Sequence, residues 1–269
     1  MKIVTGAQRV LLGVVLSVLL VYAAGENAQK VNSLVKKDII MLIDIAGKQR
    51  MLSQRIAKDY LYLGKHIAVD KANRQLKASL KEFKAGQAKL NKMINNPEIK
   101  NLLEFVDMSL GELEEILKKP FDVSNAQLVM DLSESMLEGS QYVVDSLKNS
   151  IKIKESNIVA KSGKQRMLSQ RIAKYYIAYQ AGIKDKNTVD QMKATVKEFS
   201  ENHKLLTENP SNTASINEKL ANVDKLWKIV YKFYLKIEKG GLPFIVFTST
   251  DDITRKMDDI TKNYVEIYK

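Results

Sequence analysis

Two arginines are the side chains in this sequence whose type and spacing best suit ligand binding. Arg50 and Arg166 occupy the same place in the motif GKQRMLSQRIAK, which begins at Gly47 and recurs unchanged at Gly163, 116 residues later. Packing alone would tolerate exchanges among apolar residues of similar size. Identity that extends through Lys, Gln, Arg and Ser, while the flanking residues differ, therefore favours a shared functional demand over a recent duplication.

The motif has two distinct faces when it is read as a helix. Leu52 and Ile56 lie on one face, with the spacing of residues that face a core. The opposite face carries small and polar residues at alternating spacings of three and four, which is typical of a coiled-coil seam. The members of this seam in the two copies are Gly47, Arg50, Gln54 and Ala57, and Gly163, Arg166, Gln170 and Ala173. We expect one face to pack inside its own bundle and the seam to approach a second helix.

An arginine in such a seam indicates a small anion. A guanidinium is costly to bury without a partner, and no acidic residue recurs beside it on the seam. Arginine binds oxyanions in a planar, bidentate manner, and a nearby glycine leaves its backbone open to a ligand. We therefore predict a ligand site at Gly47, Arg50, Gly163 and Arg166, with Gln54, Ala57, Gln170 and Ala173 as a secondary interface. The alternative is that both arginines lie on a solvated face.

The motif resembles the signature of the type IV pili methyl-accepting chemotaxis transducer N-terminal domain, the PilJ/NarX-like sensor domain. The resemblance implies that each copy lies on the first helix of a periplasmic four-helix bundle. It also implies that two such helices meet across a dimer interface and hold nitrate or nitrite between their arginines. By this resemblance, Arg50 and Arg166 match the arginine that contacts the anion, and Gly47 and Gly163 match the glycine whose backbone faces it. The family often has Asn three residues before the glycine, where this chain has Asp44 and Ala160. A carboxylate there is unfavourable for an anion site.

Residues 1–25 have the features of a signal peptide. The basic residues Lys2 and Arg9 precede an apolar run, and this run is shorter than the ~20 residues needed to span a bilayer. The alternative is an uncleaved membrane anchor. We therefore expect export to a periplasm. The chain has no cysteine, which excludes a disulfide framework and thiol chemistry. Its net charge of +12 would attract small anions, and export argues against nucleic acid as a partner.

The composition predicts an all-α fold, because only 4 prolines and 12 glycines interrupt a sequence rich in helix formers. We expect two tandem PilJ/NarX-like units with the plan of four-helix bundles, residues 26–150 and 151–269. In the first unit the expected helices cover about 27–65, 70–93 and 98–118, and a fourth begins after a cap at Ser124. In the second unit the first helix passes through Gly163 and ends near residue 181, and the second covers about 188–207. The third contains Trp227, and the last begins near residue 250. Few turn signals separate Ser124 from Gly182, which favours one long continuous helix that stacks the units end to end. The alternative is a turn near residues 149–150 that places Arg50 opposite Arg166 within one chain.

No constellation of residues indicates catalysis, a cofactor or a metal. The motif serines have no histidine beside them, and His66 and His203 are predicted to be surface residues. The leading prediction is a sensor-type protein that binds an oxyanion such as nitrate or nitrite. Because the sequence carries no signalling portion after the second unit, we expect the signal to pass to a separate membrane partner. The alternative is a non-catalytic docking or oligomerisation module whose seam binds a partner protein. A second copy of the chain is a further candidate partner.

Overall fold

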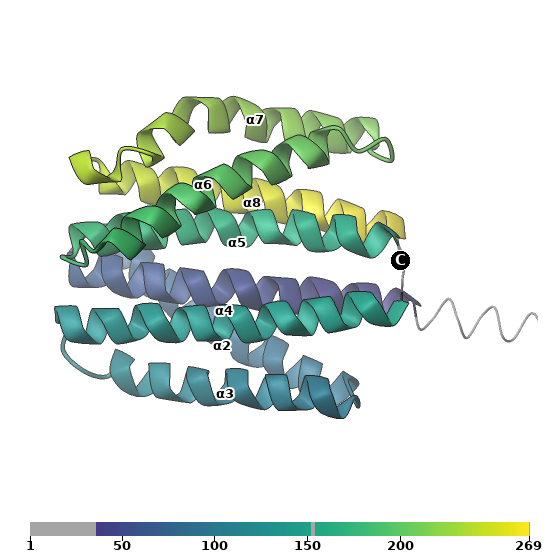
Figure 1. The fold of residues 1–269 in the computed structure, drawn as a ribbon, viewed down its shortest axis with the longest axis horizontal. Helices are drawn as coiled ribbons and strands as arrows, with labels where there is room; N and C mark the ends of the chain where they lie inside the picture. Colours follow the sequence, from purple (N-terminus) through teal and green to yellow (C-terminus); the bar gives the residue numbers. More distant parts are fainter. Residues whose placement is uncertain (1–35, 152–153, 269) are drawn as a thin grey trace, which may run out of the picture.

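The computed structural model describes residues 36–151 and 154–268, and these ranges are built of helices (Figure 1). The N-terminal helix covers residues 36–64. It is followed by α2 (Val69–Met93), α3 (Pro97–Leu117), α4 (Val123–Ile151), α5 (Lys154–Gln180), α6 (Lys186–Thr207), α7 (Ala214–Tyr234), the short 3-10 helix η1 (Ile237–Lys239) and α8 (Pro243–Tyr268). No strand occurs within the described ranges, so the predicted all-α fold is confirmed. The predicted signal peptide lies outside them, and no helix inside them has the length and apolar character to cross a membrane.

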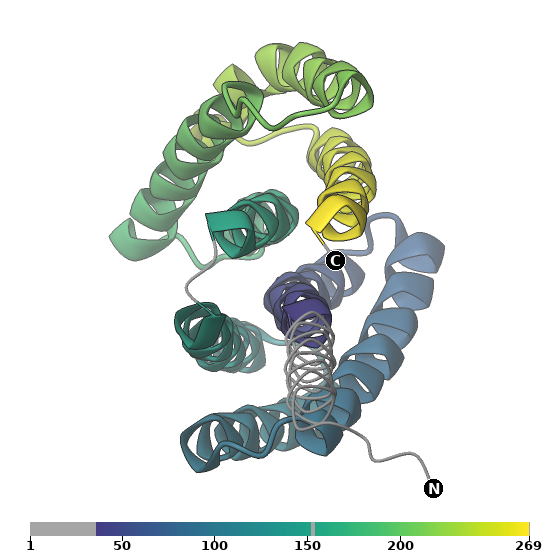
Figure 2. The same ribbon diagram turned by 90° about the vertical axis from the view of Figure 1, so that its right-hand side faces the viewer.

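Four inner helices form the centre of the molecule: the N-terminal helix, α4, α5 and α8 (Figure 2). The pair α2 and α3 covers one side of this centre, and the pair α6 and α7 covers the other. The N-terminal helix and α5, which carry the two motif copies, run side by side in the same direction (Figures 1 and 2). The two copies therefore face each other about an approximate two-fold axis within one chain.

The prediction of one continuous helix through the junction is wrong. Glu134 of α4 forms ion pairs with Arg171 and Lys174 of α5, so α4 returns alongside α5 in the opposite direction. The alternative, in which a turn folds the two units side by side, describes the arrangement; residues 152–153 themselves lie outside the described ranges. Local turn signals were misleading because the path at the junction is decided by tertiary packing, in which each copy buries the seam of the other.

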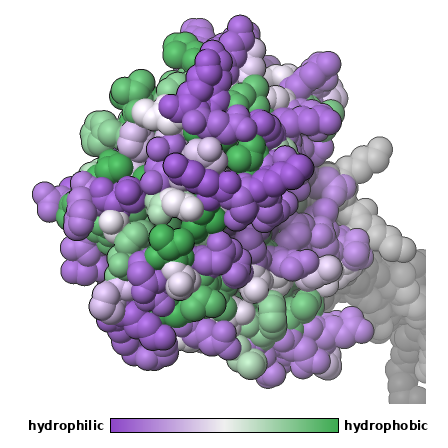
Figure 3. Space-filling model, turned by 60° about the vertical axis from the view of Figure 1, so that its left-hand side comes forward, coloured by the Kyte–Doolittle hydropathy of each residue, from purple (hydrophilic) through white to green (hydrophobic). Residues whose placement is uncertain are grey.

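Both faces of each motif helix are buried. Leu52 and Ile56 are in the core as expected, and so are the seam residues Gln54 and Ala57, all with no exposed surface. The same holds for Leu168, Ile172, Gln170 and Ala173 in the second copy. The second helix that the seam was expected to approach belongs to the same chain. Figure 3 shows that hydrophilic side chains are interspersed with smaller apolar groups on one outer face.

Several helix starts differ from those predicted. Helix α2 begins at Val69, one residue before the expected start at Asp70, directly after Ala68, whose φ of 51° is left-handed. Helix α4 is capped by Asp122, which accepts a bond of 2.7 Å from the backbone N–H of Asn125, and Ser124 lies inside the helix. Helix α8 begins at Pro243 and not near residue 250, because proline suits the first turn of a helix and the apolar run after it is buried in part.

Candidate functional site

The two motif arginines meet in the interior between the N-terminal helix and α5. Arg50 and Arg166 are each 1% exposed. A Cβ atom on Gly47 would lie 3.2 Å from the Nη2 atom of Arg50 and 3.6 Å from that of Arg166. A Cβ atom on Gly163 would lie 3.1 Å from Nη2 of Arg166 and 3.5 Å from Nη2 of Arg50. The four residues predicted to form the ligand site are thus brought together, and the glycines make room for the guanidinium groups.

Arg166 is neutralised by two carboxylates. Its Nη2 donates to Oδ1 of Asp44, and its Nη1 donates to Oδ1 of Asp258 on α8, both at 2.7 Å. Burial alone would lower the pKa of Arg166, but the two carboxylates raise it above its usual value. Burial would likewise raise the pKa of Asp258, yet Arg166 brings it down to about 2. The expectation that the seam arginines have no acidic partner is therefore wrong for Arg166.

Arg50 has a different environment, although its position in the motif is equivalent. Its Nη1 donates to Oε1 of Gln141 at 2.6 Å, and its Nη2 donates to the carbonyl oxygen of Ala160 at 3.1 Å. No ion pair joins it to a carboxylate among the described residues. Burial, followed by the nearby charge of Arg166, lowers the pKa of Arg50 to about 10. Ala160 is the repeat equivalent of Asp44, so the carboxylate noted in the first copy acts on the arginine of the second copy.

A cavity of about 380 Å³ opens beside Arg50. Its wall includes Lys148, Lys161 and Lys164 and a single carboxylate, that of Asp145. The Asp145 side chain accepts bonds from Gln141 at 2.8 Å and from Lys148 at 3.1 Å, so it is already shared. The cavity thus carries an excess of positive charge, which attracts small anions. Of the charged residues in this cavity, the sequence analysis identified only Arg50 as a ligand-binding residue. Lys164 could also have been proposed, because it belongs to the repeated motif.

Much of the motif's identity has a packing explanation. Gln49 Nε2 donates to the carbonyl oxygen of Phe83 at 2.9 Å, and Gln165 Nε2 donates to that of Phe199 at 3.0 Å. Each motif helix therefore forms an equivalent hydrogen bond to the second helix of its own unit. Identity at these glutamines reflects buried hydrogen bonds, because a buried amide without a partner is costly.

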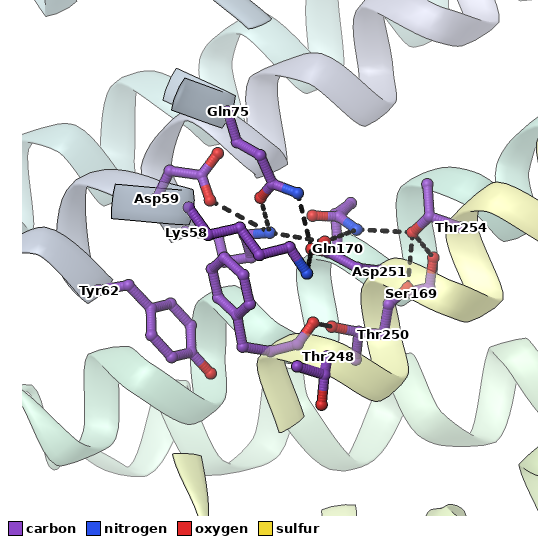
Figure 4. Close-up of polar contacts among 12 residues, drawn as sticks. Lys58, Asp59, Tyr62, Gln75, Ser169, Gln170, Thr248, Thr250, Asp251 and Thr254 are labelled. Carbon is purple, nitrogen blue, oxygen red and sulfur yellow. Dashed lines mark hydrogen bonds and ion pairs between the residues drawn. The ribbon is translucent and has the colours of Figure 1, made fainter. Parts of the chain in front are cut away.

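The motif lysines form ion pairs that join the two units. Lys58, whose side chain has no exposed surface, donates to Oδ1 of Asp251 on α8 at 2.8 Å and to Oε1 of Gln75 at 3.0 Å (Figure 4). Lys174 is paired with Glu134 on α4 in the equivalent place. Sequence reasoning missed both pairs, since each acid belongs to the last helix of the other unit.

Part of the chain matches a known family. Residues 151–237 match the family described as PilJ: Type IV pili methyl-accepting chemotaxis transducer N-term. The second unit is similar to this sensor domain. The PilJ match covers about a third of the chain, from the second motif copy through α6 and α7. The family is one of signalling sensors, not of enzymes. No curated protein and no solved structure matches.

The histidines lie in different environments. His66 is exposed, as predicted, but His203 is 4% exposed and its ring stacks on Phe199 with centroids 6.0 Å apart. The surface prediction for His203 is wrong, because α6 turns this side chain inward, and burial lowers its pKa. Within the described ranges no cluster of His, Asp and Glu could hold a metal ion.

Proposed function

We propose that this chain is an exported sensor-type protein that binds one small oxyanion, such as nitrate or nitrite, at Arg50 and passes the signal to a separate membrane partner. One observation carries the proposal: Arg50 is buried, bonds only to the uncharged groups of Gln141 and Ala160 among the described residues, and opens on a cavity lined by three lysines. The PilJ match supports the sensor class. The segment 1–25 is the basis for proposing export.

The charges of the site favour one anion per chain. Arg166 is already occupied by Asp44 and Asp258, whereas Arg50 faces the positive charge of Arg166 without a carboxylate of its own. An oxyanion that accepts hydrogen bonds from Arg50 would compensate its buried charge and weaken the repulsion between the two guanidinium groups. We propose that this would tighten the contact between the N-terminal helix and α5, and that this shift in helix packing is the signal.

We further propose that a single chain completes the site. The resemblance implies that two chains contribute one motif helix each, whereas here both motif helices belong to the same chain and lie side by side. The docking alternative has less support. The seam residues Gln54 and Ala57 are fully buried, so a partner protein could reach the seam only by displacing the other unit. A membrane partner or a second copy would bind another surface.

The proposal is tested by thermal-shift titration of the mature chain from about residue 26 against nitrate, nitrite, sulfate and chloride. A ligand at 100 times its dissociation constant adds about 2.7 kcal/mol to the free energy of unfolding. We expect a saturable rise of the melting temperature with nitrate or nitrite. A rise that follows ionic strength and is the same for every salt would contradict specific binding.

The repeat supplies a matched pair of variants. Ala160→Asp places a carboxylate beside Arg50, in the position where Asp44 stands beside Arg166, and is expected to abolish the nitrate response. Asp44→Ala removes a carboxylate from Arg166 and is expected to strengthen it. If Ala160→Asp binds nitrate as tightly as the unchanged protein, Arg50 is not the anion ligand.

A further inference from the structure

Two other cavities lie beside the motif helices, one in each half of the molecule. The larger, of about 510 Å³, lies between the N-terminal helix, α2 and α8, and the smaller, of about 320 Å³, lies between α4, α5 and α6. Four residues of the larger wall recur at the 116-residue offset in the smaller: Lys48, Met51, Arg55 and Glu82 correspond to Lys164, Met167, Arg171 and Glu198. The two cavities are therefore equivalent places in the repeat and can be compared directly.

In the smaller cavity the protein itself satisfies the motif arginine. Arg171 Nη2 donates to Oε2 of Glu134 at 2.7 Å. The same nitrogen lies 3.1 Å from Oε1 of Gln191 and 3.3 Å from the hydroxyl of Tyr175. An internal carboxylate thus occupies the guanidinium of Arg171.

In the larger cavity the equivalent arginine has no such partner. Arg55 forms no hydrogen bond or ion pair with the described residues, although its charge acts on the nearby Asp59 and Asp251. The residue in the place of Glu134 is Asp251, whose side chain is one methylene shorter. Its carboxylate is held by Lys58 at 2.8 Å and by Gln75 at 2.7 Å (Figure 4). Lys71 contacts the same carboxylate at 3.0 Å. This carboxylate forms no hydrogen bond or close ion pair with Arg55, although the charge of Arg55 helps to lower its pKa.

The wall formed by the last helix also differs between the two cavities. Thr254 on α8 stands where α4 has the larger, apolar Leu137, and Arg255 stands where α4 has the acidic Glu138. The first difference leaves more room, and the second makes the wall more positive. The other cations of the larger wall are paired: Lys48 with Glu82, Lys71 with Asp251 and Arg255 with Asp252. The wall holds as many carboxylates as cations, but Arg55 is the one cation on it that has no ion-pair partner among the described residues.

We propose that the larger cavity is a second ligand site, which binds a small organic monocarboxylate through Arg55. The ligand's carboxylate would take the place that Glu134 takes against Arg171, because this is the group that the same motif arginine binds in the other half. The organic part would lie in the remaining space, against Met51 and Thr254. This site is separate from the oxyanion site at Arg50 and does not depend on it.

The test is isothermal titration calorimetry of the full chain with propionate, which reproduces the carboxylate and methylenes of a glutamate side chain. Propionamide, of similar shape and without charge, is the control. We expect saturable binding of propionate and none of propionamide. Arg55→Gln should weaken propionate binding at least about tenfold, since a hydrogen-bonded charge pair is lost. Because Arg55 bonds to no described residue, this variant should keep the fold, which circular dichroism checks.

Two further variants separate the possible results. Arg255→Glu reproduces the acidic Glu138 of the smaller cavity at an exposed position, and it should also weaken propionate binding. Arg50→Gln should leave propionate binding unchanged while it removes nitrate binding. The proposal is overturned if the unchanged protein does not bind propionate, or if Arg55→Gln binds it with the same affinity.

Discussion

Replacing the buried Lys58 by methionine tests whether the cross-unit ion pairs hold the two halves together. Lys58 and Lys71 contact the same carboxylate, that of Asp251, but their side chains are 0% and 41% exposed. Lys58→Met keeps a long apolar chain and removes the buried charge. Lys71→Met makes the same chemical change at a partly solvated position. The two variants therefore differ in burial and not in the carboxylate that they affect.

The expected magnitudes follow from that difference. Removal of one partner of a buried ion pair costs about 3–5 kcal/mol, because the remaining charge stays buried without compensation. An exposed pair contributes about 0–1 kcal/mol, since water and salt screen it. Lys58→Met also removes the partner of Asp59, which lies 3.1 Å from Nζ of Lys58. We therefore expect Lys58→Met to lower the free energy of unfolding by about 3–5 kcal/mol, and Lys71→Met by less than about 1 kcal/mol.

Urea denaturation followed by circular dichroism measures both values. The midpoint should fall for Lys58→Met while a single transition is kept, because the inner helices of the two units form one core. If Lys58→Met is no less stable than Lys71→Met, the buried pair with Asp251 does not stabilise the fold. Two separate transitions in the unchanged protein would show that the halves unfold independently.

Two other predictions concern the N-terminal helix and its neighbours. Burial raises the pKa of Asp59 to about 7 in the folded state, from 3.8 when unfolded, so between these pH values the folded state holds a proton that the unfolded state has released. The free energy of unfolding should therefore fall as pH rises from about 4 to 7. Asp59→Asn should remove up to about 4 kcal/mol of this dependence, measured by urea denaturation at several pH values. A pH dependence that is unchanged in this variant would refute the assignment. Gly64→Ala places a Cβ 2.1 Å from the Phe121 ring and should lower the free energy of unfolding by about 1–3 kcal/mol. Gly111→Ala on α3 meets nothing within 4 Å and should raise the free energy of unfolding by up to about 1 kcal/mol. Equal melting temperatures of the two variants would contradict this.

The fold class and the pairing of the motif helices could be predicted from the sequence, because composition, helical spacing and the repeated small-residue seam are local properties of the chain. The direction of the chain after α4 could not. The seam is buried whether the second motif helix comes from the same chain or from another one, and turn signals near residues 149–150 are weak. The choice depends on how much surface the two units bury together, which no local pattern records.

The details of the candidate site depended on tertiary partners. Asp44 and Asp258 are separated from Arg166 by 122 and 92 residues in sequence, so the spacing on the seam could not reveal them. The identical motifs suggested two equivalent sites. The flanking difference between Asp44 and Ala160 makes the two arginines unequal, and this asymmetry became visible only when the helices were placed side by side.

The most direct test of the account is the stoichiometry of nitrate binding to a chain whose mass in solution is known. Isothermal titration calorimetry gives the number of nitrate ions per chain, and sedimentation equilibrium in the same buffer gives the assembly state. We expect one nitrate per monomeric chain, with a dissociation constant that does not change as the protein is diluted. One nitrate per two chains, or binding that is lost when a dimer dissociates, would contradict the claim that a single chain completes the site.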